Sequence, residues 1–225
     1  MHQAPPTLES PSRLYFDRLS DVIETLDFAE MDHAIALVHE AWQSGQQIIT
    51  LGNGGSAMSA LHFITDWNKS VFMASGKPFR GRSLLDNMGM MTALGNDISY
   101  DAVFEQQLRQ IAQPGDLVIA ISGSGNSPNV IRAVEYANEA GCITLGLSGF
   151  DGGKLKALAQ HSLWVNSHNM QICEDLHMVF GHIVMQVLCG VLVSAPPMSI
   201  EDDEKRAIAG LNRRARTMRR HAVGE

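Results

Sequence analysis

Histidine and carboxylate residues at helical spacing are the most chemically suggestive feature of the sequence. His62 and Asp66 are four residues apart in LHFITDW, and Glu174 and His182 are eight apart in EDLHMVFGH. Residues four apart on a helix share one face, which is a spacing typical of two ligands of one metal ion or of an acid–base pair. Eight residues span about two turns. The sequence therefore contains two candidate sets of imidazole and carboxylate groups.

The later set leaves open which carboxylate accompanies His182. Asp175 and His182 are seven residues apart and lie nearly on one line of a helix, whereas Glu174 is offset by roughly 80°. His177 follows Glu174 by three residues and can share its face. Either carboxylate can face a site, and a histidine on an apolar helix is more often a hydrogen-bonded core residue than a ligand.

Two turns rich in glycine and serine follow short apolar runs. GNGGS occupies residues 52–56, and ISGSGNS occupies residues 121–127. A helix that begins behind such a turn offers unpaired backbone N–H groups and the positive end of its dipole, to which serine hydroxyls add donors. For one turn alone, helix capping by Ser56 or Ser127 is the better explanation. Two such turns together favour a phosphate site.

The elements that must position these residues alternate between strands and helices. Apolar residues at helical spacing predict two helices, over residues 13–26 and 29–43. Five strands are predicted at residues 47–51, 82–85, 117–122, 143–148 and 162–165. Helical patterns separate these strands, and a long apolar helix follows from Ile172. This alternation predicts an α/β fold: a doubly wound parallel five-stranded sheet flanked by helices, with an N-terminal helical pair. Ligands of such sheets bind beyond the carboxyl ends of the strands, where both turns lie.

Composition sets the remaining limits. The chain has 225 residues, is 45% hydrophobic and carries a formal net charge of −7. These values predict one globular domain over residues 12–195 without general attraction to nucleic acid. We expect a flexible leader over residues 1–11 and a partly helical tail over residues 196–225. No apolar run approaches the roughly 20 residues that cross a bilayer, and the three cysteines suit a reducing compartment. We therefore expect a cytoplasmic protein.

Several ordered motifs resemble those of the sugar isomerase (SIS) domain family. They are GNGGS at 52–56, GND at 95–97, GDLVIAISGSGNSPNVIRAV at 115–134, LSGFDGGKL at 147–155 and EDLHMVFGH at 174–182. The resemblance is strongest to the phosphoheptose isomerase group, which acts on sedoheptulose 7-phosphate. It implies a phosphorylated sugar as the partner and a homotetramer built around a helical bundle, in which His182 of one subunit faces a substrate held largely by another.

The resemblance also implies roles for individual residues. Zinc, or another divalent metal, would be held by His62, Asp66, Glu174 and His182, with Asp66 as general base and His182 as general acid. On the resemblance alone, Glu174 ranks above Asp175. Contacts to the sugar phosphate are implied for Asn53, Gly54, Ser56, Asp97, Ser122, Gly123, Ser124 and Ser127. Three departures stand out: Asp66 occupies a position that is usually glutamate, Glu174 occupies one that is usually glutamine, and Ser70 replaces an arginine, so that Lys69 is expected to take over its contact.

We therefore expect an aldose–ketose isomerase that converts D-sedoheptulose 7-phosphate to D-glycero-D-manno-heptose 7-phosphate through an enediolate, with metal assistance. One alternative is an isomerase of another phosphosugar. A second is a non-catalytic SIS protein that binds a phosphosugar as a regulator or assembly factor. The pair Asp66 and His182 separates these classes, because regulatory relatives tend to lose the final histidine.

Overall fold

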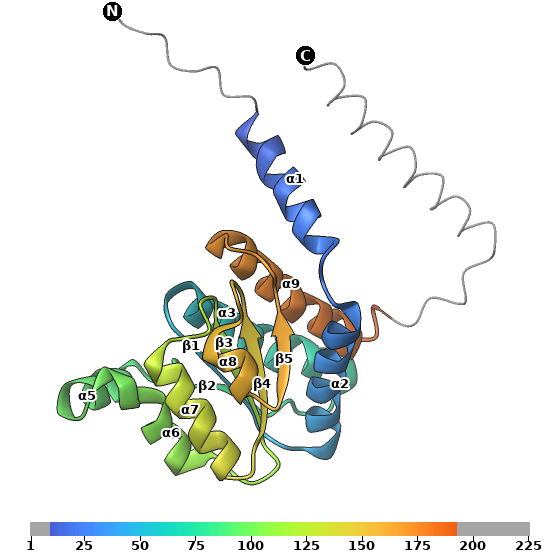
Figure 1. The fold of residues 1–225 in the computed structure, drawn as a ribbon. Helices are drawn as coiled ribbons and strands as arrows, with labels where there is room; N and C mark the ends of the chain where they lie inside the picture. The colour runs from blue at the N-terminus through green and yellow to red at the C-terminus, as the bar shows by residue number, and fades with distance from the viewer. Residues whose placement is uncertain (1–9, 193–225) are drawn as a thin grey trace, which may run out of the picture. The chain divides into compact units, whose positions relative to one another are not determined.

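A computed structural model describes residues 10–192 of the chain, so the predicted tail and most of the predicted leader lie outside the described residues. Within this range, five strands form one sheet in the order β2-β1-β3-β4-β5 (Figure 1). The strands are β1 Ile48–Gly52, β2 Gly81–Ser83, β3 Leu117–Ser122, β4 Ile143–Ser148 and β5 His161–Trp164. Every pairing is parallel. The predicted fold class is confirmed.

Helices connect the strands and also precede them. The two predicted N-terminal helices are α1 Pro11–Ile23 and α2 Phe28–Ser44. The connecting and final helices are α3 Gly54–Asp66, α4 Phe72–Ser75, α5 Met88–Asp97, α6 Val103–Ile111, α7 Pro128–Glu139, α8 Gly153–Leu158 and α9 Met170–Leu188. A π-helical segment, η1 Trp67–Val71, joins α3 to α4, and a 3₁₀ turn, η2 Tyr100–Ala102, precedes α6. Among the described helices, none is long and apolar enough to span a membrane.

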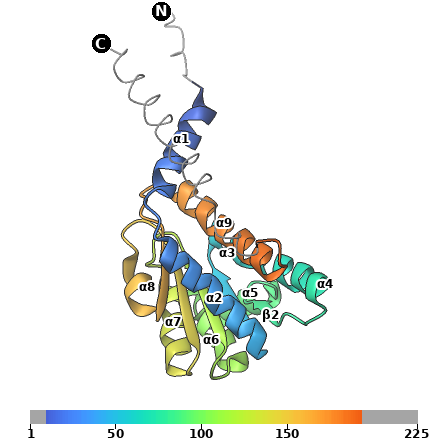
Figure 2. The same cartoon turned by 90° about the vertical axis from the view of Figure 1, so that its right-hand side faces the viewer.

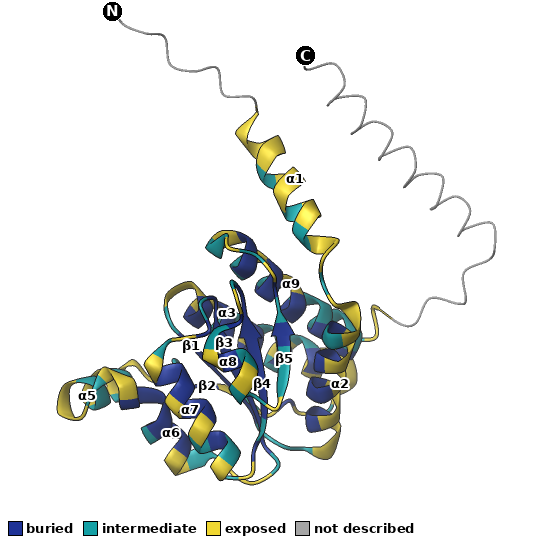
Figure 3. Cartoon of the chain, in the orientation of Figure 1, coloured by how far each residue is buried: buried dark blue, intermediate teal, exposed yellow. Residues whose placement is uncertain are grey.

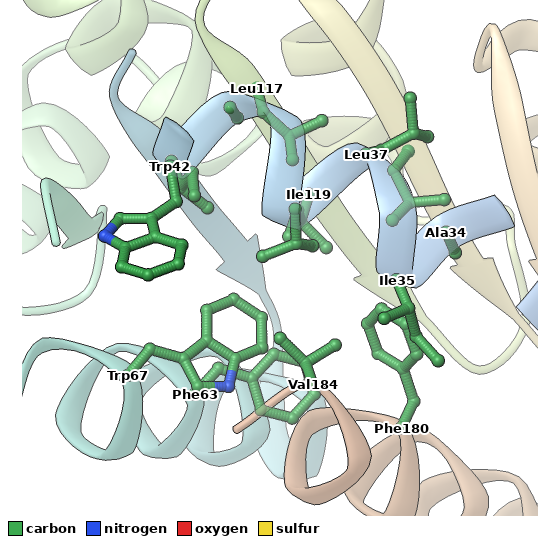
Figure 4. Packing of buried hydrophobic residues seen from close by; sticks show 14 of the residues in the cluster. Ala34, Ile35, Leu37, Trp42, Phe63, Trp67, Leu117, Ile119, Phe180 and Val184 are labelled. Carbon is green, nitrogen blue, oxygen red and sulfur yellow. The ribbon is translucent and has the colours of Figure 1, made fainter. Parts of the chain in front are cut away.

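The sheet has two covered faces because successive strand residues point to opposite sides. Leu117, Ile119 and Ile121 of β3 pack in one cluster with residues of α2, α3 and α9. Val118 and Ala120 pack in a second cluster with residues of α6, α7 and α8. Figure 2 shows α2, α3 and α9 on one side of the sheet, and Figure 4 shows how their side chains meet β3. Both faces are therefore buried, as a doubly wound sheet requires.

Helix α1 is attached differently from the other helices. None of its residues is buried, and Figure 3 shows it largely exposed. Tyr15 and Leu19 of α1 pack against a small cluster that includes Val165, Ile172 and Leu176. The apolar side chains of Leu14, Phe16 and Ile23, which flank this packed stripe, are exposed. Helix α1 thus packs one narrow stripe against the cluster that includes residues of α9 and leaves apolar side chains exposed on both sides of that stripe.

His177 fastens α9 to the sheet. Its side chain is fully buried, and its Nε2 lies 3.2 Å from the carbonyl oxygen of Ser148 at the end of β4. A carbonyl only accepts, so Nε2 donates the proton, and it is burial of the ring, not this bond, that favours the neutral imidazole. Burial lowers the pKa of His177 to about 4. This histidine is the hydrogen-bonded core residue that the sequence alternatives included, and it fixes α9 over the strand ends.

The buried His177 makes stability depend on pH. Its pKa falls from 6.5 to about 4 on folding, so the unfolded chain binds the additional proton between these values. The contribution of the neutral His177 to the free energy of unfolding is complete above pH 6.5. It is lost as the pH falls towards 4, at up to about 1.4 kcal/mol of unfolding free energy per pH unit. We expect urea unfolding at pH 7.5, 6.0 and 5.0 to show this loss in the wild type and a smaller one in His177→Gln. His168→Gln, which removes an exposed histidine, should keep the wild-type slope. Equal slopes in His177→Gln and the wild type would contradict the assignment.

Candidate active site

Helices α3 and α9 run side by side in the same direction and carry most of the predicted catalytic residues. Near the start of α3, Gly55 lies against the carboxylate of Glu174. About two turns further along each helix, His62 meets His182. The corresponding spacings, seven residues on α3 and eight on α9, are nearly equal, as a parallel helix pair requires. The two candidate sets found in the sequence therefore face each other within one chain.

His62, Asp66 and His182 form a compact group at this contact. The Nε2 atoms of His62 and His182 are 3.0 Å apart, and His62 Nε2 is 3.2 Å from Asp66 Oδ2. One potential ligand atom from each residue lies within 4.8 Å of the others. Two imidazole nitrogens this close cannot both carry a proton, so one proton or one cation must lie between them. Two nitrogen donors and one carboxylate oxygen are a donor set suited to a divalent metal such as Zn²⁺.

The close approach of the helices depends on a glycine next to His182. A Cβ atom on Gly181 would collide with the ring of Phe63, which is fully buried beside His62. The carbonyl of Gly181 also accepts a 2.9 Å hydrogen bond from the indole N–H of Trp67, the first residue of η1. Sequence analysis missed these three residues, although the FGH triplet places a small residue directly before the histidine.

The two candidate carboxylates of α9 point to different neighbours. Glu174 lies against Gly55, where a Cβ atom would overlap its carboxylate. Asp175 instead accepts a hydrogen bond from the hydroxyl of Tyr15 on α1, at 2.5 Å. That bond, with desolvation, raises the pKa of Tyr15 to about 12. Glu174 is thus the carboxylate directed at α3, but it is not one of the three residues whose ligand atoms cluster.

The two predicted phosphate turns follow adjacent strands. Ser56 and Ser122 are both only 5% exposed, and the hydroxyls of Ser122 and Ser127 lie 3.4 Å apart. Ser127 is the residue before α7, yet its side chain makes no capping bond, and Ser56 lies inside α3 rather than at its cap. Simple capping therefore does not explain these serines. The serine hydroxyls remain available to a ligand at the helix starts.

The serine turn is held in place from two further elements. Gly123 accepts a 2.9 Å bond from the N–H of Gly149, and Gly125 accepts one of 2.9 Å from the N–H of Leu155. A Cβ on Gly123 would overlap the sulfur of Met170, the first residue of α9. Helix α9 therefore extends from the serine turn, past the start of α3, to the His62–His182 contact.

The remaining predicted residues lie around these features. Asn53 and Gly54 form the first turn, and the Asn53 side chain contacts Asn129 and Tyr100. Asp97 ends α5, is exposed, and accepts a 2.8 Å bond from Asn96. Lys69 is exposed on η1, three residues after Asp66. The π-helical turn around Lys69 was not predicted, because the same residues also fit an α-helix; such turns are frequent near functional sites.

Comparison with known proteins identifies the family to which the chain belongs. Residues 14–149 match the SIS domain family. A phosphoheptose isomerase of Aliarcobacter butzleri is 37% identical over 172 residues, covering 76% of this chain and 90% of the relative. One of Pelobacter propionicus is 40% identical over 157 residues, covering 70% and 82%. The structure of the phosphoheptose isomerase GmhA from Neisseria gonorrhoeae is similar with a TM-score of 0.75 and 29% identity, covering 82% of this chain and 100% of that one.

The parallel sheet, the serine turns and the family match define the chain as a member of the SIS domain family. Its similarity to the bacterial relatives is extensive and covers most of both sequences. Within the SIS family the chain belongs to the phosphoheptose isomerase group, and it is an isomerase.

Replacing Gly181 by alanine tests the helix contact. The added methyl group would force α9 away from Phe63, at a cost of about 1–3 kcal/mol in unfolding free energy, and would separate His182 from His62. A displacement of about 1 Å is expected to lower kcat about 10²-fold. The measurements are chemical unfolding and turnover of a ketose phosphate. Val179→Ala, at an exposed position on the same helix, should change the stability by less than about 0.5 kcal/mol. Wild-type kcat in Gly181→Ala would refute the role of this contact.

Proposed function

We propose that the protein converts D-sedoheptulose 7-phosphate to D-glycero-D-manno-heptose 7-phosphate. The observation that carries this proposal is the convergence of His62, Asp66 and His182 from two helices, one of which begins at a phosphate-type turn. An aldose–ketose isomerisation needs a base, an acid and a means of stabilising an enediolate. The names of the similar proteins supply the substrate class.

Proton transfers at two carbons and two oxygens account for the reaction. Asp66 removes a proton from C1 of the ketose, and His182 gives a proton to the carbonyl oxygen at C2. The resulting enediol loses the proton on its C1 oxygen to His182 and receives the carried proton at C2 from Asp66. The aldose forms and both groups return to their starting states. The intermediate positions of Asp66 and His62, neither fully buried nor fully exposed, allow both contact with substrate and partial exclusion of water.

A divalent metal, which we propose to be zinc, fits the same group. His62, Asp66 and His182 supply two nitrogens and one oxygen, and Glu174 is proposed as a further ligand. When bound, the metal would polarise the carbonyl and stabilise the developing negative charge. The proposed roles of the protein residues are to hold the metal and to move protons at C1, C2 and their oxygens.

The phosphate is proposed to bind at the two serine-bearing turns. Ser56, Ser122, Ser124 and Ser127 supply hydroxyl donors, while Asn53, Gly54 and Gly123 bring backbone or amide N–H groups close. Lys69, on η1 beyond the end of α3 that is opposite to the turn of the same chain, is proposed to supply a positive charge to a sugar phosphate, and Asp97 is proposed to contact a sugar hydroxyl. The support is that the two turns follow neighbouring strands and lead into α3 and α7.

The experiment that tests this function uses a panel of five- to seven-carbon ketose phosphates, with and without a chelator. Formation of aldose from sedoheptulose 7-phosphate above all other members, lost on chelation and restored by zinc, is the expected result. Protection against thermal unfolding by these phosphosugars without turnover of any would instead identify a non-catalytic binding protein. Preferred turnover of a shorter ketose would identify an isomerase of another phosphosugar.

Removing the proposed base or acid should lower turnover. Asp66→Asn and His182→Ala are each expected to reduce kcat by about 10²-fold or more, because each removes a proton-transfer group. Asp32→Asn and His39→Ala, at exposed positions of α2, are the matched controls and should retain kcat. Near-normal rates for Asp66→Asn or His182→Ala would refute the assigned roles.

The protein is further proposed to be a cytoplasmic homotetramer in which α1 is covered by other copies. Leu14 and Phe16 are 50% and 64% exposed on a helix without buried residues, and exposed apolar side chains of this kind are typical of an interface. Light scattering coupled to size exclusion should give four times the mass of one chain. Phe16→Glu should shift this mass downwards, whereas Asp17→Glu, also on α1, should not. A monomeric wild type would disprove this assembly.

A further inference from the structure

The side chain of Asn53 joins three separate segments of the chain. Asn53 ends the β1–α3 turn, Asn129 is the second residue of α7, and Tyr100 begins η2. The amide groups of Asn53 and Asn129 form a reciprocal pair, with hydrogen bonds of 2.8 and 3.0 Å. The hydroxyl of Tyr100 lies 2.8 Å from Asn53 Oδ1. Sequence analysis assigned no role to Asn129 or Tyr100.

The orientation of these amides follows from a backbone group. The N–H of Val130 can only donate, and it lies 3.0 Å from Asn129 Oδ1. This contact identifies the oxygen of Asn129 and places its NH₂ group opposite the oxygen of Asn53. The Tyr100 hydroxyl must then donate to Asn53 Oδ1, which already accepts from Asn129. Asn129 is 1% exposed, so water does not substitute for these partners.

The consequence concerns what Asn53 can still offer to a ligand. Its oxygen accepts two hydrogen bonds, and one of its two amide hydrogens is donated to Asn129. The remaining side-chain group is a single N–H donor. The turn that carries it also carries Ser56 and lies next to the serine turn. A fixed donor at this position is suited to an anionic or hydroxyl oxygen of a sugar phosphate.

We propose that Asn129 and Tyr100 are positioning residues that hold Asn53 as a hydrogen-bond donor to the bound sugar phosphate. This inference rests on the proposed function for the identity of the ligand. Tyr100 follows Asp97 by three residues, so its bond to Asn53 also joins the segment after α5 to the phosphate turns. Loss of either partner leaves Asn53 held by fewer hydrogen bonds, so its N–H donor is less firmly oriented and substrate affinity falls while the proton-transfer groups are untouched.

A double-mutant cycle between Tyr100 and Asn53 tests this inference. Tyr100→Phe removes one hydroxyl from a ring that is 56% exposed, so folding should be unaffected. We expect KM for the ketose phosphate to rise about three- to tenfold, the effect of one hydrogen bond, with kcat nearly unchanged. In an Asn53→Ala background the same substitution should have no effect, because the residue through which Tyr100 acts is gone. Tyr136→Phe, whose ring packs on Arg109 of α6, is the control and should leave KM unchanged.

Asn129→Asp provides a second test that retains the shape of the side chain. It keeps the oxygen that accepts from Val130 but replaces the NH₂ donor by an acceptor that faces Asn53 Oδ1. We expect a larger rise in KM than for Tyr100→Phe. An unchanged KM in both variants, or an effect of Tyr100→Phe that persists in the Asn53→Ala background, would overturn the inference.

Binding of inorganic phosphate separates this inference from the proposed reaction. Thermal stabilisation by phosphate should weaken in Tyr100→Phe and Asn129→Asp even if no ketose phosphate is turned over. If no ketose phosphate is turned over but phosphate still stabilises the wild type more than the two variants, the proposed function alone is refuted. Absence of phosphate stabilisation in the wild type, or equal stabilisation in wild type and variants, would refute the positioning of Asn53.

Discussion

The contact between α3 and α9 at Phe63 and Gly181 is the constraint on which the rest of the site depends. It brings the backbones close enough for His62 and His182 to reach 3.0 Å of each other. It also sets the lateral position of α9, so that Glu174 meets the start of α3 and Met170 meets the serine turn. A packing interaction without polar atoms therefore determines the geometry of the polar site, as expected where close-packed interiors transmit small displacements.

Much of the fold was accessible from the sequence, because its strands are short apolar runs bounded by turn residues. Strands β3 and β4 have the predicted limits, Leu117–Ser122 and Ile143–Ser148. Helix α6 was missed because VFEQQLRQI is mostly polar. Its Glu105 accepts from Arg109, four residues later on the same helix, and from Arg132 of α7, a pairing that local spacing does not predict; both arginines lower the pKa of Glu105. The π-helical turn η1 was also missed, because its residues fit an α-helix equally well.

In the candidate site, residue spacing in the sequence identified the chemical groups but did not predict that α3 and α9 bring them into contact. The proximity of His62 and Asp66 was predicted because they are four residues apart on one helix. The contact of His62 with His182 joins residues 120 positions apart and depends on tertiary packing. Periodicity alone could not choose between Glu174 and Asp175; the structure directs the first to α3 and the second to Tyr15. Asn129 gave no signal in the sequence, because a buried asparagine at a helix start looks like an ordinary capping residue.

The two turns proposed to hold the phosphate, residues 52–56 and 121–127, contain no acidic, basic or histidine side chain. Their attraction for an anion comes from hydroxyls, amides and the dipoles of α3 and α7, and none of these groups titrates near neutrality. The two turns therefore contain no group whose ionisation would make anion binding depend on pH. The phosphoryl group of the ligand, with its second pKa near 6, is then a principal source of pH dependence in binding.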